Sequence, residues 1–379
     1  MDELKEKLEK ELLQLERKMM GASQSVYARY INDAYYLADL YKYYFGEDPH
    51  ILTKDYRSKT ANILDLIYNN RKEFFDLDQK LIDTYKEAGF YYFGRDAYDK
   101  ISDDEFIELL GEFLNYFNVD IARIYNDIQT KRQFLDYDEK DIYGVSYLLP
   151  SLNNYYIGVG ATTIRSDMMI LETVIHELAH VYTAQFLKNY NYKGMENLLG
   201  GLFSETISLY SELSFTNFLA NKWKYQTSVL YHRNTVDAEL LSEYKCARYM
   251  TKALLEQSHN PNISVCSNGF NTWVEGEFEY DPDKDIPFFR STDSIKKGTT
   301  SSILYSVGIV DAYKLLDLEL HGAEPKEIIN DYLISLQNEN ANEEFIQQVF
   351  DLSFMKKDIA ERNEKLLKLQ PITGYKIPF

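Results

Sequence analysis

The chain has 379 residues, 45% hydrophobic and 27% charged, which is enough to bury a large core and is the balance of a globular protein. Its formal net charge of −19 repels phosphate backbones and so argues against a nucleic-acid partner. There is no apolar run long enough to span a membrane and no signal-peptide pattern at the start. We therefore expect a cytoplasmic protein without a membrane partner, in which Cys246 and Cys266 are reduced.

Helical periodicity dominates the first 140 residues. Leucines recur every three or four positions in residues 2–20, which predicts an amphipathic helix. A capping box formed by Ser102 and Glu105 predicts the start of another helix. In chain order, the helices expected in this part cover residues 2–20, 24–45, 54–69, 78–87, 102–117 and 118–135.

The pattern changes near residue 142. Residues 142–149 and 155–159 are short and rich in aromatic and β-branched side chains, which predicts two strands of a small sheet. We expect a mainly α fold with this sheet beside the helix that follows it, and two lobes around a cleft, residues 1–140 and residues 141–379. The later helices are predicted at residues 167–188, 202–223, 237–257, 301–321, 325–337, 343–350 and 355–369, with a long irregular segment at 258–297.

The sequence His176-Glu177-Leu178-Ala179-His180 lies within the helix predicted at residues 167–188. Residues four apart share a helix face, so His176 and His180 can direct two imidazoles at one point. Two neutral imidazoles and a carboxylate are a typical ligand set for a catalytic zinc ion, with Glu177 beside the water as general base. We therefore expect one Zn²⁺ per chain.

The third ligand is expected on the next helix. The continuation found in metzincins is excluded, because Thr183 and Phe186 occupy its glycine and histidine positions. The acidic candidates that remain are Glu205 and Glu212. The neighbours of Glu205 one turn away are apolar or small, so its carboxylate is expected to face the core, where binding a metal would remove the cost of burying it unpaired.

These residues resemble the thimet oligopeptidase and oligopeptidase F group of zinc metallopeptidases. The match covers residues 172–180, then 203–205 at the family's spacing, and then Glu212. The resemblance implies a zincin-like helical metallopeptidase with Glu205 as the third zinc ligand. It also implies that Glu172 orients an imidazole N–H of the ligand pair and that Glu212 plays a similar supporting part.

A second stretch, residues 303–308, is similar to the family's tyrosine-containing helix. This likeness implies that Tyr305 donates its hydroxyl to the oxyanion of the reaction. The chain departs from the family in lacking a histidine shortly before this tyrosine. Gly298 and Ser302 stand where the family has tyrosines, and Ala179 stands where it usually has glycine.

Two further predictions concern the surroundings of the substrate. The strand at residues 155–159 precedes the motif helix as the substrate-binding edge strand does in other zincins. Main-chain hydrogen bonds to a peptide are expected along this strand from Tyr156, Ile157, Gly158 and Val159.

His232 is a second candidate donor to the oxyanion, although we expect it to be an exposed histidine at a helix end.

The sequence therefore predicts a zinc-dependent peptidase that hydrolyses short peptides with a metal-activated water and Glu177 as general base. One alternative is a related helical zinc carboxypeptidase, which needs a basic residue for the free carboxylate of its substrate. Another is a catalytically impaired zinc protein that binds peptides, favoured by the missing histidine. A third is a metal-free chain with an accidental motif.

Overall fold

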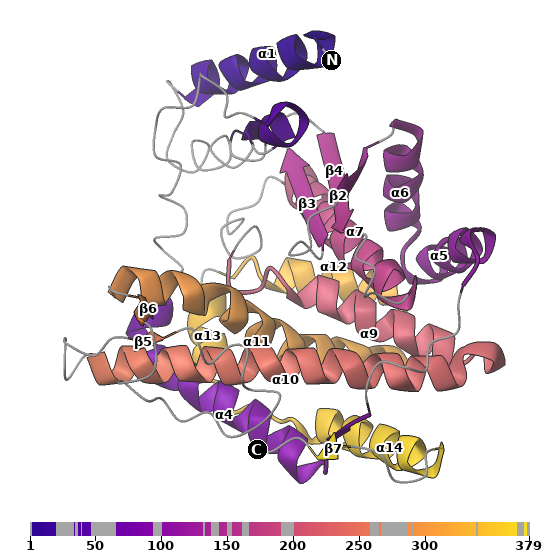
Figure 1. Ribbon diagram of the computed structural model, residues 1–379, viewed down its shortest axis with the longest axis vertical. Helices are drawn as coiled ribbons and strands as arrows, with labels where there is room; N and C mark the ends of the chain where they lie inside the picture. Colours follow the sequence, from indigo (N-terminus) through magenta and orange to yellow (C-terminus); the bar gives the residue numbers. More distant parts are fainter. Residues whose placement is uncertain are drawn as a thin grey trace.

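The protein is mostly α-helical, and the mainly α fold class predicted from the sequence is confirmed (Figure 1). The computed structural model describes residues 2–19, 34, 37–38, 40–46, 66–93, 101–131, 133–137, 144–149, 154–160, 167–190, 201–257, 265–266, 287–289, 292–338, 340–369 and 375–376. The helices are α1 (Asp2–Met19), α4 (Arg71–Glu87), α5 (Asp103–Phe117), α6 (Val119–Lys131), α7 (Asp167–Tyr190), α9 (Thr206–Ala220), α10 (Gln226–Gln257), α11 (Thr292–Leu320), α12 (Pro325–Ser335), α13 (Ala341–Gln347) and α14 (Ser353–Leu369), and a short 3₁₀ turn spans Trp223–Tyr225.

The predicted helices occur close to where the periodicity places them. The motif helix is α7, and the Ser102 cap of α5 is confirmed, since its Oγ accepts a hydrogen bond from the Glu105 N–H at 3.4 Å. Several boundaries differ. The helices α4, α10 and α11 start at Arg71, Gln226 and Thr292 rather than at 78, 237 and 301, and residues 202–205 precede α9 instead of opening it. Of the helices predicted at 24–45 and 54–69, residues 40–45 and 66–69 are helical, and much of the remainder lies outside the described residues.

The sheet beside α7 contains β2 (Phe134–Tyr137), β4 (Asn154–Gly160) and β3 (Gly144–Leu149), in that order. The two predicted strands are confirmed as β3 and β4. The prediction that helix continues to residue 135 is wrong, because α6 ends at Lys131 and Phe134 pairs in parallel with Ile157. This pairing joins segments far apart in the sequence, so a local pattern could not indicate it.

The expectation that the second predicted strand lies at the edge of the sheet is also wrong. β4 lies in the middle, where Ile157, Gly158 and Val159 face β2 on one side and β3 on the other. Their main-chain groups are thus used within the sheet. Tyr155 and Ile157 belong to the core, and Tyr156 lies on the opposite face of the strand. The pKa of the Tyr44 phenol is raised to about 12, mainly by burial and secondly by its nearness to Tyr156. Any part of these side chains in binding a substrate stays a prediction.

Helix α9 is the centre of the helical body, packed against α7, α10 and α11 (Figure 1). Its apolar side chains alternate with hydroxyl residues, and both kinds are buried all around the helix. The hydroxyls are tolerated because they find hydrogen-bond partners. Ser211 Oγ donates to Ser208 O at 2.6 Å and Thr216 Oγ1 to Leu213 O at 2.9 Å within the helix, whereas Ser214 Oγ donates to Glu319 of α11 at 3.0 Å. Small side chains of this kind let neighbouring helices approach α9 closely.

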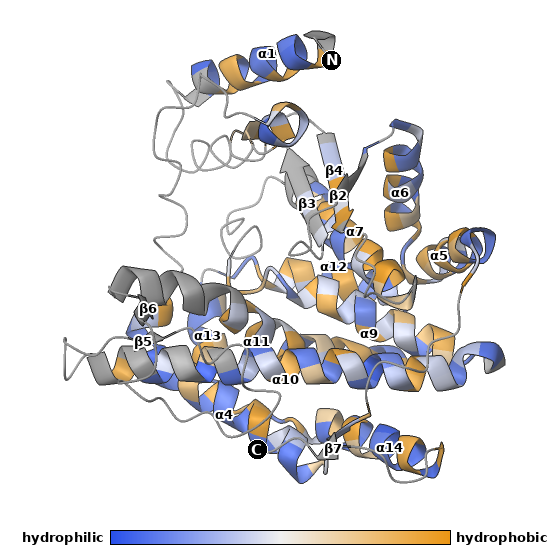
Figure 2. Ribbon diagram, viewed as in Figure 1, coloured by the Kyte–Doolittle hydropathy of each residue, from blue (hydrophilic) through white to orange (hydrophobic). Residues whose placement is uncertain are grey.

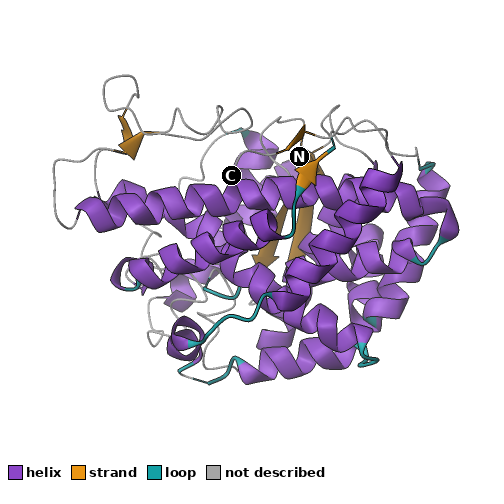
Figure 3. Ribbon diagram, turned by 90° about the horizontal axis from the view of Figure 1, so that it is seen from below, coloured by secondary structure: helices purple, strands orange, loops and turns teal. Residues whose placement is uncertain are grey.

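Helix α7 carries the motif between this helical body and the small sheet. It packs against α9 on one side and against β3 and β4 on another, with α5 and α6 also in contact (Figure 1). Seen from below, helices make up most of the described protein and strands a small part of it (Figure 3). Many residues of α7 and α9 are apolar, as the orange segments of both helices in Figure 2 show, and most of these side chains are buried. The polar residues of the motif are held within this apolar setting.

Two further strand pairs join distant parts of the chain. β1 (Tyr91–Tyr92) pairs antiparallel with β7 (Tyr375–Lys376), and β5 (Val265–Cys266) with β6 (Pro287–Phe289). Much of the irregular segment predicted at 258–297 lies outside the described residues, although its end forms the start of α11.

The division into lobes at residue 140 stays a prediction, and described contacts cross it at several places. β2 pairs with β4, α6 packs against α7, and α4 packs against α10 and α14. One hydrophobic cluster extends from Ile67 to Ile359. Helix α1 lies apart from this cluster and packs on residues 40–45, where the Tyr41 hydroxyl donates to Glu9 at 3.0 Å (Figure 1).

Candidate metal centre

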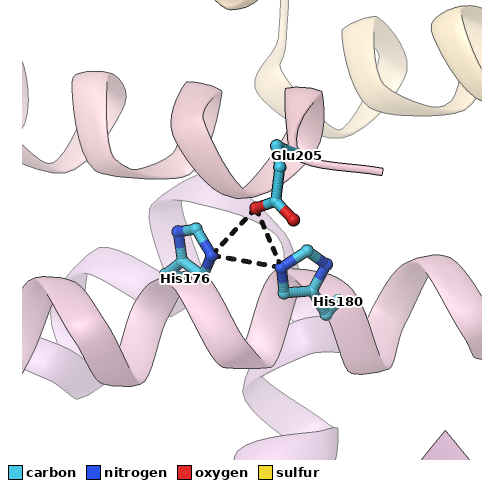
Figure 4. A group of neighbouring side chains, drawn as sticks. All are labelled: His176, His180 and Glu205. Atoms are coloured by element: carbon cyan, nitrogen blue, oxygen red, sulfur yellow. Dashed lines mark hydrogen bonds and ion pairs between the residues drawn. The ribbon is translucent and has the colours of Figure 1, made fainter. Parts of the chain in front are cut away.

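His176, His180 and Glu205 meet between α7 and the start of α9 (Figure 4). The two histidines project from successive turns of α7, and Glu205 reaches toward them from the residue before α9. His176 Nε2 lies 3.1 Å from His180 Nε2, and Glu205 Oε2 lies 3.3 Å and 3.4 Å from these two nitrogens. The group could therefore hold a metal ion.

The spacing of these atoms fits a tetrahedral zinc site. Ligand atoms bonded to one tetrahedral Zn²⁺ at 2.0–2.2 Å lie roughly 3.3 to 3.5 Å apart. The two distances to Glu205, 3.3 and 3.4 Å, lie in this range, and the 3.1 Å between the two nitrogens is slightly shorter. The donor types also fit, because two imidazoles and a carboxylate make a catalytic ligand set that leaves one position for water or substrate.

Glu212 holds the first histidine from behind. Its Oε1 lies 2.5 Å from His176 Nδ1, so the carboxylate accepts a hydrogen bond from that nitrogen. With the proton on Nδ1, the lone pair of Nε2 faces His180 and Glu205, as a metal ligand requires. Burial opposes a charge on His176, but the carboxylates of Glu212 and Glu205 raise its pKa well above the ordinary value. The supporting position expected for Glu212 is thus observed.

Glu205 is held in place by the packing of α11 on α9. Burial alone would raise its pKa, but the imidazoles of His180 and His176 keep it far below the usual range. A Cβ at Gly308 of α11 would lie 3.0 Å from Glu205 Cβ and 2.9 Å from Leu209 Cδ1. Glycine at this position therefore lets α11 approach the backbone and Cβ of Glu205 closely.

Glu177 lies on the side of α7 that faces the sheet. Its side chain is buried, and its charge contributes to the raised pKa values of His176 and Tyr305. A Cβ at Gly144, the first residue of β3, would lie 2.7 Å from Glu177 Oε1 and 2.4 Å from Thr173 Cγ2. The strand can run this close to Glu177 only because a glycine occupies its first position.

Tyr305 of α11 stands within the electrostatic field of the same cluster. The Glu205 carboxylate is the largest cause of its raised pKa, followed by burial, Glu212 and Glu177. Tyr305 is therefore near enough to these carboxylates to be affected by their charge, and its part in the reaction stays a prediction. Its helix is anchored on both sides of this residue: Ser302 Oγ donates to Glu243 at 2.7 Å, and Ser306 Oγ to Asp78 at 2.6 Å.

Glu172 and His232 are placed differently from the expectation. His232 was expected to be exposed at a helix end, but it is fully buried within α10, and its Nε2 lies 2.7 Å from Glu172 Oε2. The carboxylate of Glu172 is therefore bonded to His232, and the described contacts do not include the predicted one to His176 or His180. The sequence could not indicate this burial, because residues 231–237 are all buried and show no alternation between an exposed and a buried helix face.

Sequence reasoning also missed Gly144 and Gly308. A glycine at the start of a strand or within a helix pattern is a weak signal by itself, although it can mark a close approach of backbone. What gives these two glycines meaning is the side chain opposite each one, and that contact is tertiary.

The comparisons with known proteins add little to this geometry. No family model matches the chain, and no curated protein matches it in sequence. One solved structure, described as a "putative peptidase from Chlamydophila abortus", is similar at 12% identity and a TM-score of 0.47, over 90% of this chain and 61% of that chain. A likeness at this level does not establish a shared fold, so the function is argued from the site.

Among the residues that the structure describes, no helix combines the length and the apolar character needed to cross a bilayer.

Proposed function

We propose that the protein is a zinc-dependent peptidase that hydrolyses peptide bonds in short peptides. The observation that carries this proposal is the spacing of 3.1 to 3.4 Å among the donor atoms of His176, His180 and Glu205. The buried Glu177 directly follows His176 in the sequence. His176, His180 and Glu205 would hold the ion. When bound, zinc would polarise the peptide carbonyl and lower the pKa of a water molecule.

The side chains around this centre have separate tasks in the proposed reaction. Glu177 would take the proton from the water as its oxygen bonds to the carbonyl carbon, and would then pass this proton to the amine nitrogen as the C–N bond breaks. Tyr305 would donate a hydrogen bond to the carbonyl oxygen as it gains negative charge. Glu212 would keep His176 in its metal-binding tautomer.

The substrate would be held by β3 rather than β4. In the described residues β3 is paired on one side only, and its first residue, Gly144, lies against Glu177. An extended peptide added along this strand would form main-chain hydrogen bonds and pass the general base. Family membership in the thimet oligopeptidase and oligopeptidase F group is part of the same proposal, supported by residues 172–180 and 203–205.

The described residues contain no observation that favours the carboxypeptidase alternative. Arg233, a buried cation whose charge reaches Glu212, donates to the Tyr313 hydroxyl at 3.0 Å and serves a different network. The alternative of an impaired peptide-binding protein is separated from the peptidase by experiment.

The test combines a metal assay with a quenched-fluorescent library of short peptides, with and without a chelator. We expect one zinc per chain and cleavage that the chelator removes. Glu177→Gln should retain the metal and lose about 10²–10⁴-fold in rate, as removal of a general base does. Tyr305→Phe should also retain it and lose roughly 10²–10³-fold.

Glu73→Gln, which changes an exposed glutamate of α4, serves as the matched control and should match the wild type. Zinc binding without cleavage of any peptide would favour the impaired binding protein. An equal rate for Tyr305→Phe would remove the oxyanion role from that residue.

A further inference from the structure

The buried carboxylate of Glu172 and the largely buried one of Glu212 lie near each other behind the metal centre. Glu172 is one helical turn before His176 on α7, and Glu212 contacts that histidine from α9. The charge of Glu172 contributes to raising the pKa of Glu212, although burial is the larger cause. Like charges in a region without water repel strongly, so the direction in which each carboxylate points matters for the other.

His232 determines where the Glu172 carboxylate points. Its Nε2 donates to Glu172 Oε2 at 2.7 Å, and the two side chains are 0% and 7% exposed. The other oxygen, Oε1, is buried and has no hydrogen-bond partner in the described part of the chain. A single donor thus holds this carboxylate, and no described contact would keep it in place if that donor were removed.

The helix that supplies His232 is itself fixed. Asn234, two residues on, donates to Tyr91 O at 2.7 Å and accepts from the Phe93 N–H at 3.0 Å. Arg233 bonds to Tyr313 on the α11 side. Burying an imidazole and a carboxylate together is costly, and a buried ionisable pair beside a reactive centre is a candidate for a functional role.

We propose that His232 is a positioning residue for the metal centre, holding the Glu172 carboxylate away from the pair formed by His176 and Glu212. This inference rests on the proposed function, since it concerns the same zinc ligand. Without the donor, the Glu172 carboxylate is free to turn toward Glu212. Repulsion between the two carboxylates would then move Glu212 away from His176 Nδ1. His176 then loses the contact that orients its Nε2.

The test measures zinc affinity by competition with a chromophoric chelator. His232→Leu removes the donor and should weaken zinc binding by about 10- to 100-fold, the usual effect of losing a partner behind a ligand. His232→Gln places an amide N–H near the position of Nε2 and should restore most of the affinity. The control is His321→Leu, which changes an exposed histidine directly after the end of α11.

The decisive variant is the double one, His232→Leu with Glu172→Gln. Because the damage is expected to come from the misplaced charge of Glu172, removing that charge should bring zinc affinity back to within about threefold of Glu172→Gln alone. A direct effect of His232 on the metal, or a general loosening of the fold, would persist in the double variant. If His232→Leu does not fold, the comparison between the double variant and Glu172→Gln alone still decides.

The outcomes separate this inference from the proposed function. Wild-type affinity in His232→Leu, or a gap of tenfold or more between the double variant and Glu172→Gln, overturns the role of His232 and leaves the peptidase proposal intact. A wild-type protein that binds no zinc overturns both. Recovery in the double variant together with rescue by His232→Gln supports the positioning role.

Discussion

Two groups of buried charged side chains adjoin α10, and they differ in charge balance. The α10–α14 network consists of Tyr85, Arg233, Asp237, Tyr313, Asp358 and Arg362, with two arginines facing two aspartates. Arg362 Nη2 lies 2.8 Å from Asp237 Oδ2 and 3.2 Å from Asp358 Oδ2, and the tyrosine hydroxyls bond within the same group. Each charge there has an opposite partner.

The metal-centre cluster consists of His176, Glu177, His180, Glu205 and Glu212. It brings three carboxylates around two imidazoles, and the buried Glu172 adds a fourth carboxylate behind it. Burying a charge without an opposite partner costs free energy, whereas in a balanced network each charge is stabilised by its partners. The difference lies in the excess of acidic side chains, more than in burial of charge as such, and it marks the cluster that could hold a cation.

The largest expected effect comes from breaking the balanced network. Arg362→Met leaves Asp237 and Asp358 without their shared cation and should lower the free energy of unfolding by about 3–5 kcal/mol. Zinc stoichiometry of the folded fraction should stay unchanged. Urea unfolding measures the loss, and Arg123→Met, at an exposed ion pair, is the matched control with a change of about 0–1 kcal/mol.

The unbalanced cluster should respond to a cation instead. Adding zinc at about 100 times its dissociation constant should raise the free energy of unfolding by about 2.7 kcal/mol, because the ion binds only the folded protein. Glu205→Gln should remove this gain. Thermal unfolding with and without zinc measures it, and an equal gain in both proteins would exclude Glu205 as a ligand.

Packing at the third carboxylate supplies a smaller effect. Gly308→Ala forces Leu209 and Glu205 to shift, so we expect a loss of about 1–3 kcal/mol in stability together with weaker zinc binding. Gly111 of α5 has nothing within 4 Å of an added Cβ, so Gly111→Ala should be neutral or stabilising, by up to about 1 kcal/mol. Chelator competition and urea unfolding, run on both variants, make the comparison. Unchanged zinc binding in Gly308→Ala would contradict the role of this close approach.

The smallest effect is the pH dependence of the metal-free protein. Burial, with the charge of Glu172, raises the pKa of Glu212 from 4.5 to about 7, and the neighbouring carboxylates raise that of His176. Both groups bind protons more tightly when folded, so their stability contribution is present at low pH and is lost as pH rises from about 4.5 through 7 and beyond. Urea unfolding across this range should show a shallower decline in Glu212→Gln than in the wild type. Equal slopes would contradict the prediction.

Much of the fold follows from local patterns. The apolar repeats, the Ser102 cap and the change of composition near residue 142 were sufficient to predict most helices and two of the strands. The pairing of β2 with β4 was missed because it links residues that are more than 20 positions apart. The edge position of β3 was missed for the same reason, since sequence order does not state the order of strands in a sheet.

By itself the sequence determined which residues can act. The spacing of His176 and His180 on one helix face is a property of the α-helix, and the apolar neighbours of Glu205 indicated that its carboxylate faces inward. Only the tertiary structure decided how these residues are supported. Glu212 behind His176, His232 on Glu172, and the glycines opposite Glu177 and Glu205 are contacts between elements distant in the chain, and their energies depend on packing and burial that no local pattern records.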